Sequence, residues 1–161
     1  MEPAIALAEE AGREILKVYA TDFSVESKDD ESPLTKADLA SNRVIVNGLA
    51  ALSPKLPIIS EETGLPEFEE RSGWPRYWLI DPLDGTKEFV KRNGEFTVNI
   101  ALIENGAPTF GVVHVPVQNV TYVGLEGSGA QRRDANGEST PIHVSGRSAN
   151  PVSGLDLIKV R

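Results

Sequence analysis

Two aspartates stand three residues apart in the segment W78-L-I-D-P-L-D-G-T86, at Asp81 and Asp84. Asp, Pro and Gly in this order also suit an ordinary type I turn, so a turn with no further function is one interpretation. A turn, however, needs only the first aspartate. Two carboxylates on one side of the chain repel each other unless a cation lies between them, so the second aspartate favours a metal site.

The segment after the aspartates is suited to phosphate. Gly85 and Thr86 open a short predicted helix, residues 86–92, and free backbone N–H groups at the start of a helix bind phosphate oxygens. Two divalent cations about 4 Å apart, held by carboxylates, can position an attacking water and a leaving oxygen in phosphate hydrolysis. Because oxygen ligands are present and cysteine is absent, the site favours Mg²⁺ over zinc.

Three further acidic residues leave two interpretations open. Glu61 and Glu62 follow a short apolar run, so they are either ligands at a strand end or a solvated pair in a loop. Asp38 occupies the last position of T35-K-A-D38, which fits a capping box with Asp in the place of Glu. Asp38 therefore either belongs to the site or only secures its own helix.

The basic side chains near the motif are less specific. Lys87, Lys91 and Arg92 are typical of a solvated helix face, although their position next to the motif would also let them neutralise a second phosphate. His114 and His143 lie in strand patterns, and we expect them to be packed or surface residues rather than ligands.

The pattern of apolar residues predicts the elements that position these side chains. Amphipathic helices are expected over residues 3–20 and 35–52, separated by a mobile polar loop, S24 to P33. Short buried strands are expected at 56–59 and 77–80. An antiparallel meander follows at 96–103, 109–115 and 120–125. Pro116 is expected to mark a bulge or the end of the second of these strands. A last hairpin is expected at Asn136-Gly137 before 142–145. This order predicts an α+β fold, an antiparallel sheet with two long N-terminal helices packed on it.

Composition limits the partners. The 161 residues are 40% hydrophobic and 25% charged, which is typical of a globular domain, and the net charge of −8 disfavours binding to a nucleic acid polymer. The absence of cysteine excludes disulfides and thiolate metal sites and fits a reducing compartment. No signal peptide or stretch of about 18 apolar residues is present. We expect a cytoplasmic protein without stable membrane insertion, and peripheral association with the inner membrane stays open.

Taken together, T35-K-A-D38, I59-S-E-E62 and W78-L-I-D-P-L-D-G-T86 resemble the metal-dependent, lithium-sensitive phosphatases that include inositol monophosphatases, fructose-1,6-bisphosphatases and bisphosphate nucleotidases. Residues 84–103 are similar to CysQ-type 3'(2'),5'-bisphosphate nucleotidases, since Lys87-Glu88-Phe89 stands where inositol monophosphatases usually carry Thr-Asn-Phe. The resemblance implies a hydrolase of a small phosphorylated nucleotide, 3'-phosphoadenosine 5'-phosphate, a by-product of sulfate activation that is cleaved to AMP and phosphate. An inositol or sugar monophosphatase of the same superfamily is the alternative.

The resemblance also implies ligands for two or three Mg²⁺ ions. Glu61 would bind the first ion and Asp81 would bridge two ions. The carbonyl of Leu83 would complete the first site and Asp84 would hold the second. Glu61, Leu83 and Asp84 would thereby also contribute to substrate binding.

The same resemblance implies which residues activate the attacking water and which contact the phosphate. Thr86 would pair with Asp38 to orient and activate the attacking water. Glu62 and the amides of Gly85 and Thr86 would support a further ion or the phosphate. The implied reaction is direct in-line attack by water, without a phosphoenzyme.

The chain departs from the family pattern in its carboxyl-terminal part. Family enzymes carry a second α/β half with a Trp-Asp-x-x-Ala-Gly block, whose aspartate completes the second metal site. Here neither Trp74 nor Trp78 is followed by Asp, and the tail after Ser148, residues 149–161, is atypical. We therefore expect residues 1–161 to be the amino-terminal metal-binding part of the fold, a truncated form whose own activity is in doubt.

Two further expectations follow from this departure. On the order of a hundred residues are expected to be missing, so a non-catalytic fragment that binds metal or phosphate is the second functional interpretation. Apolar surface that the missing half would cover should be exposed, and such surface favours self-association.

Overall fold

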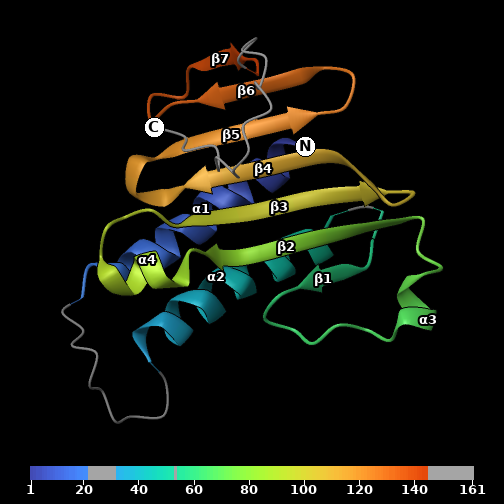
Figure 1. Cartoon of the computed structure of the whole chain (residues 1–161), viewed down its shortest axis with the longest axis horizontal. Helices are drawn as coiled ribbons and strands as arrows, with labels where there is room; N and C mark the ends of the chain where they lie inside the picture. Colours follow the sequence, from blue (N-terminus) through green and yellow to red (C-terminus); the bar gives the residue numbers. More distant parts are fainter. Residues whose placement is uncertain (22–31, 53, 145–161) are drawn as a thin grey trace, which may run out of the picture.

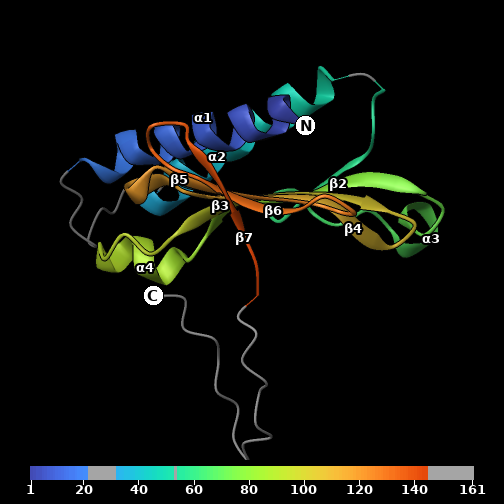
Figure 2. The same ribbon diagram turned by 90° about the horizontal axis from the view of Figure 1, so that it is seen from above.

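The computed structural model describes residues 1–21, 32–52 and 54–144. These residues form two layers, with helices α1 (Glu2–Tyr19) and α2 (Pro33–Ala50) packed on one face of a seven-stranded sheet (Figures 1 and 2). Most of the loop predicted from Ser24, and the tail 149–161, lie outside the described residues. Within the described part, no helix combines the length and the apolar character that crossing a membrane requires.

Helix α2 begins two residues earlier than predicted. Ser32 is its N-cap, with its hydroxyl oxygen accepting a hydrogen bond from the backbone N–H of Thr35 at 3.2 Å, and Pro33 occupies the first turn. Because Thr35 lies inside the helix, it cannot be the cap of a capping box. The capping interpretation of Asp38 is therefore wrong, and Asp38 is buried against the sheet instead.

The sheet runs in sequence order. Its strands are β1 (Ile58–Ser60), β2 (Arg76–Asp84), β3 (Thr97–Glu104), β4 (Ala107–Val115), β5 (Val120–Leu125), β6 (Gly129–Arg133) and β7 (Ser139–Ile142). All neighbours are antiparallel except β1 and β2, because the chain returns through α3 (Phe68–Arg71) and enters β2 in the direction of β1. The α+β fold class is confirmed, and the sheet is mixed rather than wholly antiparallel.

Two predictions about the end of the meander have different outcomes. Pro116 begins a short 3₁₀ helix, η1 (Pro116–Gln118), so it marks the end of β4 as expected. The last hairpin also forms, with the N–H of Gly137 donating to the carbonyl of Asp134. Its second strand, however, ends at Ile142, where the predicted strand was to begin.

The core lies between the helices and one face of the sheet. Small residues of α1 let that helix approach the sheet closely, and the apolar side chains of β2 to β4 fill the other side of the core. The buried members include Ala4, Ala8, Ala11, Trp78, Ile80, Val98, Ile100, Phe110 and Val112. The opposite face is open: Leu79 is 43% exposed and Val113 is 40% exposed. Exposed apolar surface is thus present, as expected.

Helix α4 (Thr86–Lys91) forms as predicted and is anchored by aromatic packing. The ring of Phe89, which is fully buried, lies 5.2 Å from that of Tyr19 and 5.4 Å from that of Phe96. Arg92 follows the helix and donates hydrogen bonds to the carbonyls of Thr21, at 3.0 Å, and Tyr19, at 2.7 Å. Arg92 therefore joins α4 to the end of α1, and it stays exposed to solvent as expected.

Candidate metal and phosphate site

A β-bulge brings the two aspartates to the same side of the sheet. Strand β2 continues through Asp84, with Asp81 opposite Asn99 and Asp84 opposite Thr97, so three steps on β2 match two on β3. In a regular strand, residues three apart face opposite sides. The extra residue restores the common side for Asp81 and Asp84. The turn interpretation of this segment is therefore wrong.

Helix α2 is joined to the bulge by a buried hydrogen bond. The Ser41 hydroxyl donates to the carbonyl of Pro82 at 2.7 Å, and Ser41 is completely buried. Asp38 lies three residues earlier on the same face of α2. The contact that fixes α2 on the bulge therefore also places Asp38 next to Asp81.

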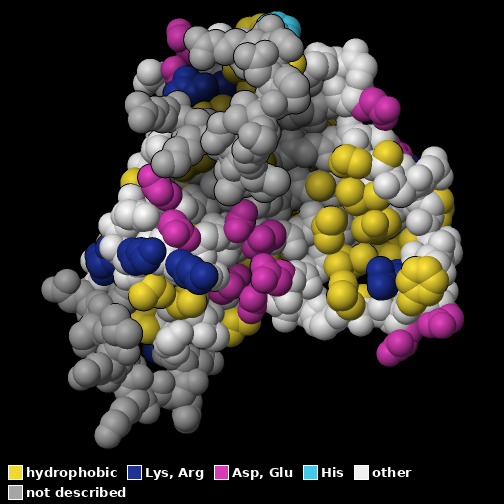
Figure 3. Space-filling view, viewed as in Figure 1, with side chains coloured by type: hydrophobic (Ala, Val, Ile, Leu, Met, Phe, Trp, Pro, Cys, Tyr) yellow, Lys and Arg dark blue, Asp and Glu magenta, His cyan; other side chains and the backbone are white. Residues whose placement is uncertain are grey.

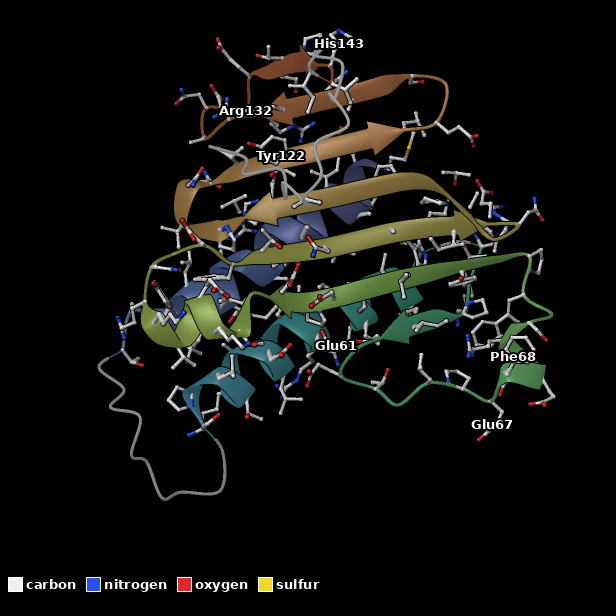
Figure 4. The ribbon with its side chains drawn as sticks, viewed as in Figure 1. Glu61, Glu67, Phe68, Tyr122, Arg132 and His143 are labelled. Carbon is white, nitrogen blue, oxygen red and sulfur yellow. The ribbon has the colours of Figure 1, made fainter. Side chains whose placement is uncertain are left out.

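The end of β1 is tied to both α2 and β2. The Ser60 hydroxyl donates to the Asn42 side-chain oxygen at 2.8 Å and accepts from the N–H of Glu62 at 3.3 Å. The N–H of Glu61 donates to the carbonyl of Ile80 at 3.3 Å. Figure 4 shows Glu61 between β2 and α2. These glutamates are thus backbone-anchored beside the aspartates, although their side chains are exposed.

Burial and mutual repulsion raise the pKa of two carboxyl groups. Burial has the largest effect on Asp38, and with the nearby charges of Glu62, Asp81 and Glu61 it raises the pKa to about 8. Burial, followed by the charges of Glu61 and Asp84, raises the pKa of Asp81 to about 7, and only the Leu83 backbone opposes this shift. The five carboxylates therefore form one interacting cluster.

The donor set fits a hard divalent cation. Oδ1 of Asp38 and Oδ1 of Asp81 are buried and have no hydrogen-bond partner, which is unusual for buried carboxylate oxygens and leaves both atoms available to a cation. All the available ligands are oxygens, the type that Mg²⁺ prefers. Among the described residues, however, no three acidic or imidazole side chains already converge on a single point.

The start of α4 requires glycine at position 85. Gly85 has φ +96°, and a Cβ there would lie 2.9 Å from the carbonyl oxygen of Glu95 and 3.1 Å from Cα of Phe96. Thr86 follows on the surface and makes no hydrogen bond with Asp38 among the described residues. Their pairing, and the role of the Leu83 carbonyl, stay predictions. The side chain of Leu83 is buried in the core.

The remaining candidates lie outside the cluster. His114 is buried, with Nδ1 2.9 Å from Oγ1 of Thr121, and burial followed by the nearby Arg13 lowers its pKa to about 4. It is a packed residue, as expected, and His143 is exposed. Lys87 and Lys91 are exposed and line a shallow depression of about 300 Å³ with Leu34, Thr86 and Val90.

Figure 3 looks at the face away from α1 and α2. Acidic side chains gather there between a row of Lys and Arg side chains and a hydrophobic patch. A cavity of about 640 Å³ joins the carboxylates to this patch, with Glu61, Asp81 and Asn99 at one end and apolar residues, including Leu65, Leu79 and Val113, lining the rest. Charged and apolar surfaces therefore meet at the site.

The sequence-family model described as the inositol monophosphatase family matches residues 1–158. The chain belongs to the inositol monophosphatase family. The match continues past Ser148, the predicted end of the resemblance, although residues 145–158 lie outside the described structure.

Named family members give the same result. The 3'(2'),5'-bisphosphate nucleotidase CysQ of Escherichia coli K12 is 54% identical over 129 residues, which cover 79% of this chain and 52% of that protein. The CysQ of Aggregatibacter actinomycetemcomitans is 39% identical over 132 residues, covering 82% of this chain and 49% of that protein. The chain thus spans about half the length of the curated relatives it matches.

Solved structures of the inositol monophosphatase family superpose on this fold. CysQ from Bacteroides thetaiotaomicron has a TM-score of 0.75 and 46% identity, covering 83% of this chain and 48% of that chain. An inositol monophosphatase from Anabaena has a TM-score of 0.71 and 30% identity, covering 92% of this chain and 50% of that chain. The resemblance drawn from the acidic motifs is confirmed.

Several residues that build the candidate site were not predicted from the sequence. They are uncharged and connect the acidic residues to the scaffold: Ser41, Asn42, Ser60, Thr97 and Asn99. Two of them had a usable signal, because residues three and four positions after Asp38 must share its face of a helix.

Proposed function

We propose that residues 1–161 form the amino-terminal metal-binding part of a Mg²⁺-dependent 3'(2'),5'-bisphosphate nucleotidase. The proposed reaction is hydrolysis of 3'-phosphoadenosine 5'-phosphate to AMP and phosphate. The observation that carries the proposal is the pair of buried, unpartnered oxygens, Oδ1 of Asp38 and Oδ1 of Asp81. The identity to proteins named CysQ supports the choice of substrate.

Four residues are proposed to hold the cations. Glu61 and the Leu83 carbonyl would bind the first, Asp81 would bridge two, and Asp84 would hold the second. Support comes from the bulge, which turns Asp81 and Asp84 to the same side, and from the charge of Glu61 acting on Asp81. When bound, divalent cations supply positive charge that polarises phosphoryl oxygens and lowers the pKa of water.

Groups of the chain itself would then accept the proton and contact the phosphate. Asp38 would accept the proton of the attacking water at Oδ1, and Thr86 would orient that water from the start of α4. Glu62 and the amides of Gly85 and Thr86 would lie against a further ion or the phosphate. The positive φ of Gly85 supports this role, because it lets the backbone turn into α4 without a side chain in the way.

The proposal is tested by Mg²⁺ binding and by phosphate release from a panel of 3'-phosphoadenosine 5'-phosphate, inositol 1-phosphate and fructose 1,6-bisphosphate. We expect Mg²⁺ to bind the wild-type chain, and Asp84→Asn to remove that binding. Any phosphate release should be fastest from the nucleotide and should be inhibited by Li⁺. Glu10→Gln, which removes an exposed charge on α1, is the control. An Asp84→Asn variant with unchanged binding and turnover would refute the metal assignment.

The second candidate is a non-catalytic module that binds metal or phosphate. It is favoured by the geometry of the cluster, because among the described residues no three acidic or imidazole side chains converge on one point. We propose that the 161-residue chain binds Mg²⁺ through this cluster yet turns over slowly or not at all without a further acidic ligand. Fast phosphate release by the purified chain would remove this candidate, whereas preference for inositol 1-phosphate would favour an inositol monophosphatase activity, as in the Anabaena enzyme.

We also propose that the exposed apolar face favours self-association through a second copy. Leu65 is 67% exposed, and Leu79 and Val113 are each about two-fifths exposed on the same side. Light scattering of the wild type and of Leu79→Lys should show a larger mass for the wild type. Equal monomer masses for both would contradict the proposal.

A further inference from the structure

Asn99 lies between the two aspartates of the bulge. It is the β3 residue opposite Asp81, and its Nδ2 donates a hydrogen bond to Oδ2 of Asp84 at 3.2 Å. It also lines the cavity together with Glu61 and Asp81. Asn99 is therefore an uncharged donor inside a cluster of carboxylates.

A second hydrogen bond fixes the orientation of the Asn99 amide. Oγ1 of Thr97 donates to Oδ1 of Asn99 at 3.1 Å, which leaves the amide nitrogen facing Asp84. The reverse orientation would place the amide oxygen against the carboxylate, where two acceptors repel each other. Thr97 and the Asp84 charge thus select the same orientation.

The bulge is what makes this chain of hydrogen bonds possible. Thr97 and Asn99 are two residues apart on β3 and share one face. The extra residue in β2 turns Asp84 toward that face, alongside Asp81. In an unbulged strand, Asp84 would point to the other side and Asn99 could not reach it.

We infer that Asn99 is a positioning residue that holds the Asp84 carboxylate for the divalent cation. The inference rests on the proposed function. A neutral amide can orient Asp84 without cancelling its charge, which a lysine or arginine at this position would do. Groups that hydrogen-bond a metal ligand change metal affinity by about 10–100-fold when they are removed.

The inference is tested by titrating Mg²⁺ while following thermal unfolding of the 161-residue chain. Asn99→Leu removes the donor at nearly constant shape, and Asn47→Leu makes the same change on the exposed surface of α2. We expect the Mg²⁺ concentration for half-maximal stabilisation to rise about tenfold or more in Asn99→Leu and to stay unchanged in the control. Thr97→Val should raise it by a smaller factor, because the amide loses its fixed orientation.

A purely structural role for Asn99 would lower the metal-free unfolding temperature and leave the half-maximal Mg²⁺ concentration unchanged, which would overturn the inference. If Asp84→Asn removes the Mg²⁺ response while Asn99→Leu preserves it, the inference fails and the proposed function stands. If the wild type shows no Mg²⁺ response, both fail. Should Asn99→Leu not fold, Asn99→Ser gives the same readout, because a serine hydroxyl is too short to reach Asp84.

Discussion

Neutralising Asp38 should stabilise the metal-free protein. Most substitutions of buried polar residues lower stability, but Asp38 is 8% exposed and lies among other carboxylates. We therefore expect Asp38→Asn to raise the free energy of unfolding in EDTA. The gain should shrink when Mg²⁺ is added, because a cation would relieve the same repulsion in the wild type.

The size of the gain follows from the pKa of Asp38. Burial and the neighbouring charges raise this pKa from 3.8 to about 8. Because pH 7 is about three pH units above the ordinary pKa, the Asp38 carboxyl lowers the free energy of unfolding at pH 7 by about 4 kcal/mol. The introduced amide remains buried, and incomplete hydrogen bonding costs about 1–3 kcal/mol. The expected net gain is about 2 kcal/mol, or about 4–8 °C in unfolding temperature.

The direction in which the gain from Asp38→Asn changes with pH also follows from the pKa of Asp38. The unfolded chain ionises this carboxyl near its ordinary pKa of 3.8, whereas the folded protein keeps the proton up to about pH 8. The loss of folding stability caused by this carboxyl is therefore absent below pH 3.8, grows as the pH rises and is complete above pH 8. The gain from Asp38→Asn should be close to zero or negative at pH 4 and largest at pH 8.

Urea unfolding in EDTA at pH 4, 6 and 8 measures this gain. Glu10→Gln is the matched control, because it removes an exposed carboxylate from α1 and should leave stability nearly unchanged at each pH. A gain for Asp38→Asn that is equal at pH 4 and pH 8, or a loss of stability at pH 8, would refute the reasoning.

Three further changes test the scaffold. Gly85→Ala should cost about 1–3 kcal/mol in urea unfolding, because its Cβ would lie 2.9 Å from a backbone carbonyl at φ +96°, whereas Gly64→Ala, with open space around it, should be nearly neutral. Ser41→Ala should cost about 1–3 kcal/mol by leaving the buried carbonyl of Pro82 without its donor. His114 stays neutral in the fold with its pKa lowered from 6.5 to about 4, so the wild type should lose up to about 3 kcal/mol relative to His114→Gln as the pH falls from 6.5 to 4. Parallel pH profiles for these two proteins would contradict that assignment.

Local signals predicted most of the elements. Helical periodicity located α1 and α2, and alternation with turn residues located the meander. The beginning of α2 was placed too late although Ser32-Pro33 carried a signal, since Ser at the N-cap followed by Pro is typical of a helix start. The parallel pairing of β1 had no local signal, because it depends on how the chain returns between β1 and β2.

The bulge could not be predicted for a related reason. Whether Asp81 and Asp84 share a side depends on the register between β2 and β3, which places Asn99 and Thr97 opposite them. The motif itself is equally compatible with a turn, since Asp-Pro and a following glycine satisfy both. The acidic residues were therefore predictable by type and spacing, while the neutral residues that orient them depend on contacts between segments distant in sequence.

The hydrogen bonds around the acidic cluster come from neutral groups, which leaves the carboxylates available to bind a cation. In the described part of the chain, no lysine or arginine forms an ion pair with Asp38, Glu61, Glu62, Asp81 or Asp84. The scaffold instead joins α2, β1 and β2 through neutral hydrogen bonds, from Ser41 to Pro82 and from Ser60 to Asn42. An ion pair would neutralise the carboxylates and compete with a metal. Neutral donors hold the carboxylates together at a cost in stability, and that repulsion is what a bound cation would relieve.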